Sequence, residues 1–539
     1  MNLTFFRRTF NIWCLALILF GAFLPGTARS AGEASLQVEM LDQATGERIP
    51  ARVSLRDSAG YATPLPAQAV SVMYGRNDRA EGFGFQPDSA FYADGYFSLA
   101  LKPGRYTIQI SRGYEYLRQQ HEIQLRAGQV VQKVYRLQRW IDMPERGWFS
   151  ADDHIHIRRS PRENPHILKW ISAEDIHVGV LLRMGDFWTT YYAQYAFGNT
   201  GLYGEGDHLL TSGQEDPRTH EVGHTISMAA DSVVRLSQEY YLYDRVANEI
   251  HRLGGLFGYA HQGMSFHGYR GLTLDVLREK VDFLELLQFC VPEGPLALDH
   301  YYHFLDLGFA ITATAGSDFP WCGKSRYTGG EPTWDAQIGN ARFYTYTGTP
   351  FTFDAWKRGV KAGHTFVTSG PMLSLKVNGA LPGDTVQVRT GEGITVTAEA
   401  YGHPSQVPLE DLEIVAHGEV VERRVSDGSD RSRTRLSLTT EIPVSQGMWI
   451  AARCQAGDIQ VAHTTPVYVI TEEGGFHNPA TAGHYLTLSE SYLQELEEVI
   501  AVPDTGSLNH HAWRYKQELD KRIMETRQII RQLREEYIN

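Results

Sequence analysis

Apolar and polar positions alternate in short runs between residues 35 and 140. Runs such as RVSLRD and GRYTIQISRG put every second side chain on one face, as a half-buried strand requires. Turn sequences such as KPGR and RAGQ separate these runs. The pattern predicts a small antiparallel β-sandwich over residues 35–140.

The pattern changes near residue 146. From 146 to 370, apolar runs such as IHVGVLLR and FAITATAG alternate with helix-like stretches such as NPHILKWISAED and FTFDAWKRGVKAG. Strands that alternate with helices favour βα units, and therefore a parallel sheet or barrel.

Two further regions follow this one. Residues 371–470 return to strand-like runs such as GITVTAEAYG, which predict a second β-sandwich. Residues 480–539 repeat apolar positions every three or four residues among mixed charges, which predicts a helical tail. We expect this tail to pack back on its own protein, and a helix that binds a partner is the alternative.

Length and charge narrow the class of protein. The chain has 539 residues, which is too long for one hydrophobic core, so roughly two to four domains are expected. The net charge is −13 and the main body has no basic block, which argues against nucleic acid as a partner. A small-molecule substrate is expected instead, and the oligomeric state stays open.

The N-terminus has the order of a targeting segment. Arg7 and Arg8 precede the apolar run NIWCLALILFGAFLPG, and the small residues Ala28 and Ser30 follow it. This order predicts a signal peptide over residues 1–30 and a periplasmic or secreted protein, with an uncleaved anchor as the alternative. No other segment is long and apolar enough to span a bilayer, so no membrane contact is expected after cleavage.

The cysteines give little information about the fold or the function. After cleavage the chain would keep Cys290, Cys322 and Cys454, and no C-x-x-C pair that would indicate zinc is present. An odd number of cysteines allows at most one internal disulfide. A Cys290–Cys322 pair and three unpaired thiols are both open.

The stretch SADDHIHI carries the first candidate ligands. Alternate side chains of a strand point to one face, so His154 and His156 would project together. Two imidazole nitrogens placed in this way can bind one metal ion.

Further candidate ligands follow other predicted strands. TSGQEDPRTHEVGHTISM contains Glu215 and His224, GLFGYAHQG contains His261, and TAGSDFP contains Asp318. In an α/β barrel the chemistry lies at the carboxyl ends of the strands, so these side chains are expected to meet. A mixed imidazole–carboxylate set suits zinc, manganese or iron, and a carboxylate among imidazoles can bridge two ions. One to three divalent metal ions are therefore expected.

The ordered set resembles the PHP (polymerase and histidinol phosphatase) superfamily of metallohydrolases. The strings AEDIHVGVLL, GYAHQG, ELLQF, TAGSDFP and KAGHTFVTSGPMLSLKVNG are most similar to its CehA/McbA-like branch, over roughly residues 140–380. The resemblance implies a distorted (β/α)7 barrel that holds two or three metal ions. By position it implies six ligands: His154, His156, Glu215 as the bridging acid, His224, His261 and Asp318.

The flanking modules complete the expected architecture. LKPGRYTIQISRG resembles the carboxypeptidase-regulatory-like sandwiches that precede many secreted enzymes, and it is expected to have an architectural role. The expected fold is multidomain α/β plus all-β, a PHP-type barrel at 146–370 between two β-sandwiches, with a helical tail.

The chain departs from the superfamily pattern at two places. Asp318 is followed by Phe319 and Pro320 instead of x-His, and LLRMGDFW stands where Thr-Asp-His is usual. Two imidazoles of the pattern are therefore missing, so one or two metal ions are expected in place of three. The side chains that could fill a vacancy are His177, His220, His267 and Asp186.

The ligand set predicts a metal-dependent hydrolase in which a water activated by the metal attacks an ester, amide, carbamate or phosphoester. Glu215, His267 and Arg183 are the candidate catalytic residues: Arg183 would stabilise the oxyanion, and His267 or His303 would protonate the leaving group.

One alternative function is that of a phosphoesterase specifically. Another is a non-catalytic secreted carbohydrate- or surface-binding protein with a decayed metal site, which aromatic residues at 12% would suit. A purely structural metal is a third possibility.

Overall fold

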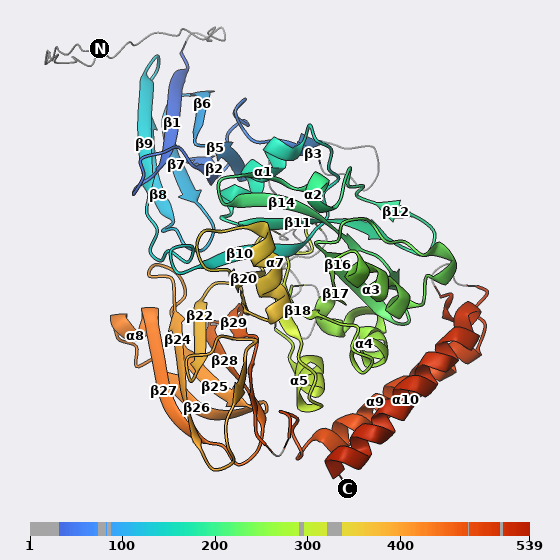
Figure 1. Ribbon diagram of the computed structural model, residues 1–539. Coiled ribbons are helices and arrows are strands. Elements are labelled where there is room, and N and C mark those ends of the chain that lie inside the picture. Colours follow the sequence, from blue (N-terminus) through green and yellow to red (C-terminus); the bar gives the residue numbers. More distant parts are fainter. Residues whose placement is uncertain are drawn as a thin grey trace, which may run out of the picture.

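The structure is a computed structural model that describes residues 32–73, 82–83, 88–289, 296–320, 337–472, 474–506 and 510–538. The expected signal peptide and the cysteines Cys290 and Cys322 lie outside these residues. The chain is a mixed α/β protein with large β-sheets, in which two β-rich parts lie one above the other beside an α/β part that is central in the sequence (Figure 1).

The N-terminal part consists of two sheets that enclose one core. Alternate side chains of its strands are buried, as the period of two requires. One sheet has the order β6–β1–β9 and the other β5–β2–β7–β8. Their bounds are β1 (Ala34–Asp42), β2 (Pro50–Asp57), β5 (Phe91–Asp94), β6 (Tyr96–Leu101), β7 (Gly104–Ser111), β8 (Gln119–Leu125) and β9 (Val130–Leu137), and the short β3 (Val72–Met73) and β4 (Gly82–Phe83) pair separately. The expectation of a purely antiparallel sandwich is wrong at one edge, because the distant strands β1 and β9 pair in parallel.

The central part pairs its strands in the order β10, β11, β14, β16, β17, β18 and β19. The pairs β10–β11–β14 and β17–β18–β19 are parallel, whereas β16 runs antiparallel to both of its neighbours. Just beyond β19, Phe319 bridges back to Ile155 at the end of β10. The bounds are β10 (Trp148–Ile155), β11 (Val178–Gly185), β14 (His208–Glu215), β16 (Gly223–Met228), β17 (Leu256–Tyr259), β18 (Phe283–Leu287) and β19 (Thr312–Ala315), with the short β12 (Thr190–Tyr191), β13 (Tyr203–Glu205) and β15 (Arg218–Thr219).

Helices connect these strands and cover their outer faces. They are α1 (Asn164–Ala173), α2 (Gly198–Gly201), α3 (Tyr243–Arg252), α4 (Gly268–Val276), α5 (Asp299–Asp306) and α7 (Phe353–Ala362), with 3-10 turns η1 (Ser237–Glu239), η2 (His261–Gly263) and η3 (Ser265–His267). In α7 the side chain of Thr352 accepts a hydrogen bond from the Ala355 amide at the N-terminus, and Gly363 adopts φ 77° at the C-terminus. The helix-like stretches of the sequence thus form helices where the periodicity predicts them.

The C-terminal β-rich part continues the central sheet. β20 (Arg342–Tyr346) pairs with β10 and with β21 (Thr365–Thr368), and β21 pairs with β29 (Gln460–Thr464). A separate sheet, β22–β24–β27, faces it across a shared apolar core. The remaining bounds are β22 (Met372–Val377), β23 (Thr385–Gln387), β24 (Gly393–Tyr401), β25 (Asp411–Ala416), β26 (Glu419–Val425), α8 (Asp430–Thr434), β27 (Arg435–Pro443), β28 (Met448–Ala456) and β30 (Val467–Ile470). Cys454 is buried in β28 with a free thiol.

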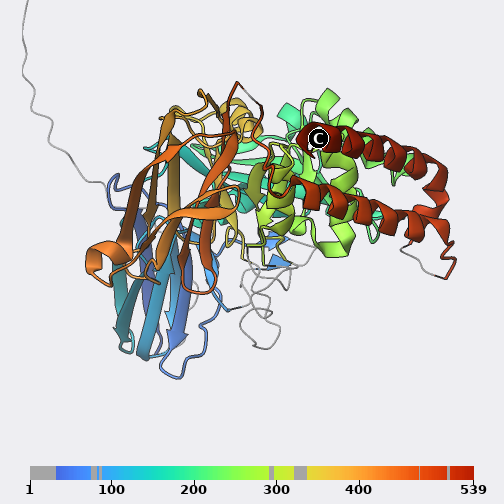
Figure 2. The same cartoon turned by 90° about the horizontal axis from the view of Figure 1, so that it is seen from below.

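The tail forms a helical hairpin that packs on its own chain. The helices α9 (Ala482–Ala501) and α10 (Lys516–Ile538) are joined through η4 (Ala512–Tyr515) and project along one side of the central part (Figures 1 and 2). Leu496 and Ile523 are buried in the central core, and Arg522 of α10 pairs with Asp244 of α3 at 2.7 Å. Within the described ranges, no helix is long and apolar enough to cross a membrane.

Candidate metal centre

The ends of the central strands bring six ionisable side chains together. β10 is buried along its whole length, and His154 and His156 each have 0% exposure. The segment after β19 reaches them because Gly316 has no side chain: a Cβ there would lie 2.4 Å from the Cβ of His154. This close approach places Asp318 against both histidines.

The first half of the group surrounds the two histidines of β10. Their Nε2 atoms face each other at 3.2 Å. Asp318 Oδ1 lies 3.3 Å from His154 Nε2 and 3.2 Å from His156 Nε2. Glu215 Oε2 lies 3.4 Å from His156 Nε2. Two imidazole nitrogens and two carboxylate oxygens therefore point at one small volume.

The second half uses the other oxygen of each carboxylate. Glu215 Oε1 lies 2.8 Å from His224 Nδ1, and Asp318 Oδ2 lies 3.4 Å from His261 Nε2. His224 begins β16 instead of ending a strand. Because β16 is antiparallel, its beginning lies at the same edge as the carboxyl ends of the parallel strands. Glu215 and Asp318 thus each span two groups of imidazoles.

Neighbouring charges keep three of these side chains in the protonation state that metal binding requires. Burial opposes the ionised form of Glu215, but the charge of Arg218 and hydrogen bonds from His154 and His156 outweigh burial and hold its pKa well below the usual range. Burial likewise opposes ionisation of Asp318, and the facing histidines lower its pKa. Burial and Arg218 lower the pKa of His224 to about 3. At neutral pH both carboxylates are ionised and His224 is neutral, as metal binding requires.

The two histidines of β10 are shifted in the opposite direction. Burial lowers the pKa of His154, but Asp318 and Glu285 outweigh it and raise the pKa well above its usual value. Burial also opposes protonation of His156, and hydrogen bonds to Asp318 and Glu215 raise its pKa. The surrounding carboxylates thus favour positive charge between the two Nε2 atoms, and either a proton or a metal cation could supply it.

Two residues beside the group were missed by the sequence reasoning. Glu285 of β18 has 0% exposure, and its Oε1 accepts a hydrogen bond from His154 Nδ1 at 2.9 Å. Its Oε2 accepts bonds from the His261 amide at 2.7 Å and from Gln288 at 2.8 Å. Arg218 Nε lies 2.9 Å from Glu215 Oε1. Glu285 could have been noticed as an acid inside the apolar run DFLELLQF. No feature of the sequence distinguished Arg218.

Two candidate catalytic residues are not brought to the group. Arg183 faces Asp216 at 3.6 Å, on the side of β11 that points away from Glu215. His267 is exposed, and its Nδ1 lies 3.1 Å from the Tyr269 hydroxyl. Among the residues that the structure describes, Arg218 is a cation that contacts the group. His303, the second candidate acid, is buried against Ser489 of α9.

The other side chains considered for a vacancy also lie elsewhere. The Asp186 carboxylate accepts from the amides of Trp188 and Thr189. His220 stacks on His510 with ring centroids 5.2 Å apart. His177 stacks on His208 in a separate group with Asp175.

That separate group is a structural network. Arg112 and Arg139 lie 3.2 Å and 2.9 Å from the Asp175 carboxylate. Arg112 also contacts His208 Nε2 at 3.2 Å, and burial lowers the pKa of His208 to about 4. Two guanidiniums already neutralise the carboxylate, so this group does not need a cation.

The donor set of the main group fits a divalent metal. Three overlapping triads of buried donor atoms lie within 4.8 Å of one another: His154–His156–Glu215, Glu215–His224–His261 and His154–His261–Glu285. Imidazole nitrogens and carboxylate oxygens are the ligands of zinc, manganese and iron. A buried carboxylate is costly unless a positive charge compensates it, and the ionised side chains of Glu215 and Asp318 are both buried. A metal would bring that charge.

Comparisons with known proteins add no functional assignment. No protein-family model and no curated protein matches the chain. The phospholipase PlaB from Legionella pneumophila is 14% identical, with a TM-score of 0.14, over 21% of this chain and 26% of that one. The chain thus spans about a quarter of that phospholipase. A variant of BcpA, the major pilin subunit of Bacillus cereus, is 6% identical, with a TM-score of 0.24, over 81% of this chain and 69% of that one. Neither likeness bears on the fold or the function.

Proposed function

We propose that this chain is a metal-dependent hydrolase whose central part is a distorted seven-stranded barrel of the PHP type. The observation that carries the proposal is the convergence of four imidazoles on two carboxylates that each span two positions. The bridge from Ile155 to Phe319, which links the first and last strands of the central order, supports the barrel.

The side chains of the group would form two adjacent metal-binding positions. His154 and His156 would hold one ion, and His224 and His261 the other. Glu215 and Asp318 would contribute an oxygen to each. Bound divalent ions supply Lewis acidity toward a carbonyl or phosphoryl oxygen and lower the pKa of a water molecule.

The protein side chains provide the rest of the site. Glu285 accepts the Nδ1–H of His154 and so directs the lone pair of Nε2 into the group. The side chain of Asp318 is 9% exposed and that of Arg218 is 22% exposed, whereas both histidines of β10 are fully buried. A substrate would therefore approach from the side of Asp318 and Arg218.

Arg218 gives a reason to favour an anionic substrate. Its guanidinium contacts Glu215, and a guanidinium binds phosphate or carboxylate oxygens in a planar pair of hydrogen bonds. The bond that is hydrolysed is proposed to be an ester, amide, carbamate or phosphoester. The alternative is an enzyme that hydrolyses phosphoesters alone.

Metal content and turnover test the proposal together. Elemental analysis of the purified protein is expected to give one or two equivalents of zinc, manganese or iron. His156→Ala is expected to lose metal and activity on a panel of phosphate esters, aryl esters and carbamates. His166→Ala is the matched control, because His166 is exposed on α1 outside the group. Near-zero metal after growth with all three ions would overturn the proposal, and bound metal without turnover would favour a structural role.

A further inference from the structure

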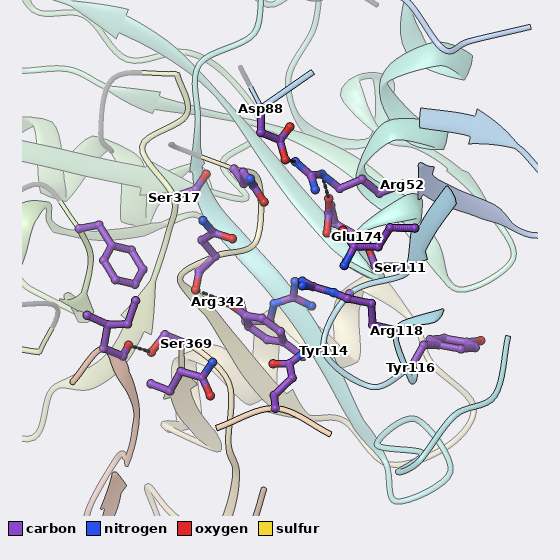
Figure 3. Close-up of a pocket in the computed structure, with 18 of the residues that line it drawn as sticks. Arg52, Asp88, Ser111, Tyr114, Tyr116, Arg118, Glu174, Ser317, Arg342 and Ser369 are labelled. Carbon is purple, nitrogen blue, oxygen red and sulfur yellow. Dashed lines mark hydrogen bonds and ion pairs between the residues drawn. The ribbon is translucent and has the colours of Figure 1, made fainter. Parts of the chain in front are cut away.

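A polar cavity of about 330 Å³ lies where the three parts of the chain meet (Figure 3). Its walls come from the N-terminal sandwich, the central part and the C-terminal sandwich, with Tyr114, Asn340 and Gln460 as one residue from each. The cavity is large enough for a ligand of one or two sugar units, since small-molecule sites begin at about 300 Å³.

The cavity is positively charged in an acidic protein. Its walls contain the guanidiniums of Arg52, Arg118 and Arg342 and the carboxylates of Asp88 and Glu174. Arg52 pairs with both acids, at 2.6 Å and 3.6 Å. Three guanidiniums against two carboxylates leave the walls with one net positive charge, although the whole chain carries −13.

Arg342 is a buried cation with a donor left over. It is 1% exposed, its Nε donates to the Gly339 carbonyl at 2.7 Å, and its guanidinium lies 4.3 Å from the ring centre of Tyr114. Its Nη1 has no hydrogen-bond partner among the described residues. Buried polar groups are normally paired, so an acceptor is expected at this position. Figure 3 shows Arg342 and Tyr114 together, beside Arg118 and below the Arg52–Glu174 pair.

Arg118 extends the positive wall toward solvent. It is exposed and forms no ion pair with any described residue. A ligand that enters would therefore meet Arg118 first and Arg342 deeper in the cavity. This order of an exposed and a buried guanidinium suits a small anion.

Uncharged polar groups make up much of the remaining wall. They are primary amides and hydroxyls, such as those of Gln109, Gln337, Gln460 and Ser111, beside the ring of Tyr114. Amides and hydroxyls pair with ligand hydroxyls, and a tyrosine ring packs on the apolar face of a sugar.

We infer that this cavity binds a small hydroxyl-rich anion, with the chemistry that a sugar acid and a sugar phosphate share. The anionic group pairs with Arg342 and Arg118, and the hydroxyls pair with the amides. The two sandwiches are therefore parts of a binding site as well as flanking modules. The inference does not depend on hydrolysis at the metal centre, although Ser317 of the cavity wall directly precedes Asp318.

Calorimetric titration of the full chain tests this inference. The probes are D-glucuronate, the non-hydrolysable 6-phosphonate of glucose, neutral D-glucose and inorganic phosphate. The first two are expected to bind, and glucose is expected to bind at least about tenfold more weakly, as the loss of one charged hydrogen bond implies. The stronger of the two anions identifies the acid group.

Three variants locate the binding. Arg118→Gln is expected to weaken both anions about tenfold, whereas Arg126→Gln, an exposed arginine outside the cavity, leaves them unchanged. His156→Ala is expected to retain their binding, because the metal centre is a separate site. Binding lost in His156→Ala but kept in Arg118→Gln would place the anion at the metal centre and overturn the inference. No binding of either anion, or glucose bound equally well, would also overturn it.

Discussion

The hydrogen bond from His154 to Glu285 offers a sharp test of how the metal centre is built. In Glu285→Gln the amide keeps one oxygen, but three donors face this side chain: His154 Nδ1, the His261 amide and Gln288 Nε2. If the oxygen accepts from the His261 amide, the new NH2 group faces His154 Nδ1. His154 must then accept there and carry its proton on Nε2, where a metal needs a lone pair.

The cost follows from that change of tautomer. Loss of the partner that orients a metal-binding histidine typically weakens metal affinity about 10- to 100-fold, or about 1.4–2.8 kcal/mol. The substitution keeps the size of the side chain, so it leaves no cavity. We therefore expect Glu285→Gln to lower metal affinity by this factor while the metal-free protein still unfolds cooperatively.

Competition with a chelator measures the change directly. Zinc affinity of the wild type and of Glu285→Gln is compared with that of Glu122→Gln, whose side chain is 69% exposed on β8, far from the centre. Equal zinc affinity of Glu285→Gln and the wild type would refute the orienting role. Loss of folding in the metal-free variant would refute it as well, since the residue would then act on stability.

Three other outcomes are expected. Gly316→Ala places a Cβ 2.4 Å from the Cβ of His154 and 2.6 Å from its amide nitrogen, so urea unfolding is expected to show a loss of about 1–3 kcal/mol or more. In the metal-free protein the raised pKa of His154 adds stability that is complete below its unfolded value of 6.5 and is lost as the pH rises through the folded value. Melting temperature is therefore expected to fall from pH 6 to higher pH, and less so in His154→Gln. Leu496→Ala removes a fully buried side chain of α9 and is expected to cost about 2–5 kcal/mol, whereas a tail free of the core would show no change in thermal unfolding.

Local signals, together with the family resemblance, pointed to the side chains that meet in the candidate centre. His261 and Asp318 follow apolar runs, and Glu215 ends the more polar strand HLLTSGQE; strand ends meet at one edge of a sheet. The structure brings them together with both histidines of β10. His224 joins them for a reason that the sequence did not reveal, because β16 reverses direction and presents its first residues at that edge.

Structural features that depend on contacts between distant parts of the chain could not be predicted from local sequence patterns. The parallel pairing of β1 with β9 joins segments that lie about ninety residues apart, and no periodicity encodes a partner. Arg218 has the same difficulty, since its role depends on a contact with Glu215 and not on its own neighbours in the sequence. Arg183 was selected by its position at the end of a buried strand, but its side chain points away from the group.

The two aspartates that precede His154 were not assigned as ligands, and Asp152 has a role distinct from metal binding. Asp152 Oδ1 accepts from the amides of Ser317 and His154, and its Oδ2 accepts from the amide of Gly339. These bonds tie β10 to the segment after β19 and to the segment before β20. Burial raises the pKa of Asp152 to about 6 even though those amides favour its ionised form.

This tie also explains how the metal centre and the cavity can lie so close together. Ser317 faces the cavity and Asp318 faces the metal centre, and the Ser317 amide is held by Asp152 at 2.9 Å. Asp318 adopts a positive φ of 49°, so the chain turns at this residue and one anchored segment lines both the cavity and the candidate metal centre. The buried Asp152 carboxylate, which accepts from three backbone amides, therefore fixes this segment beside both the candidate metal centre and the cavity.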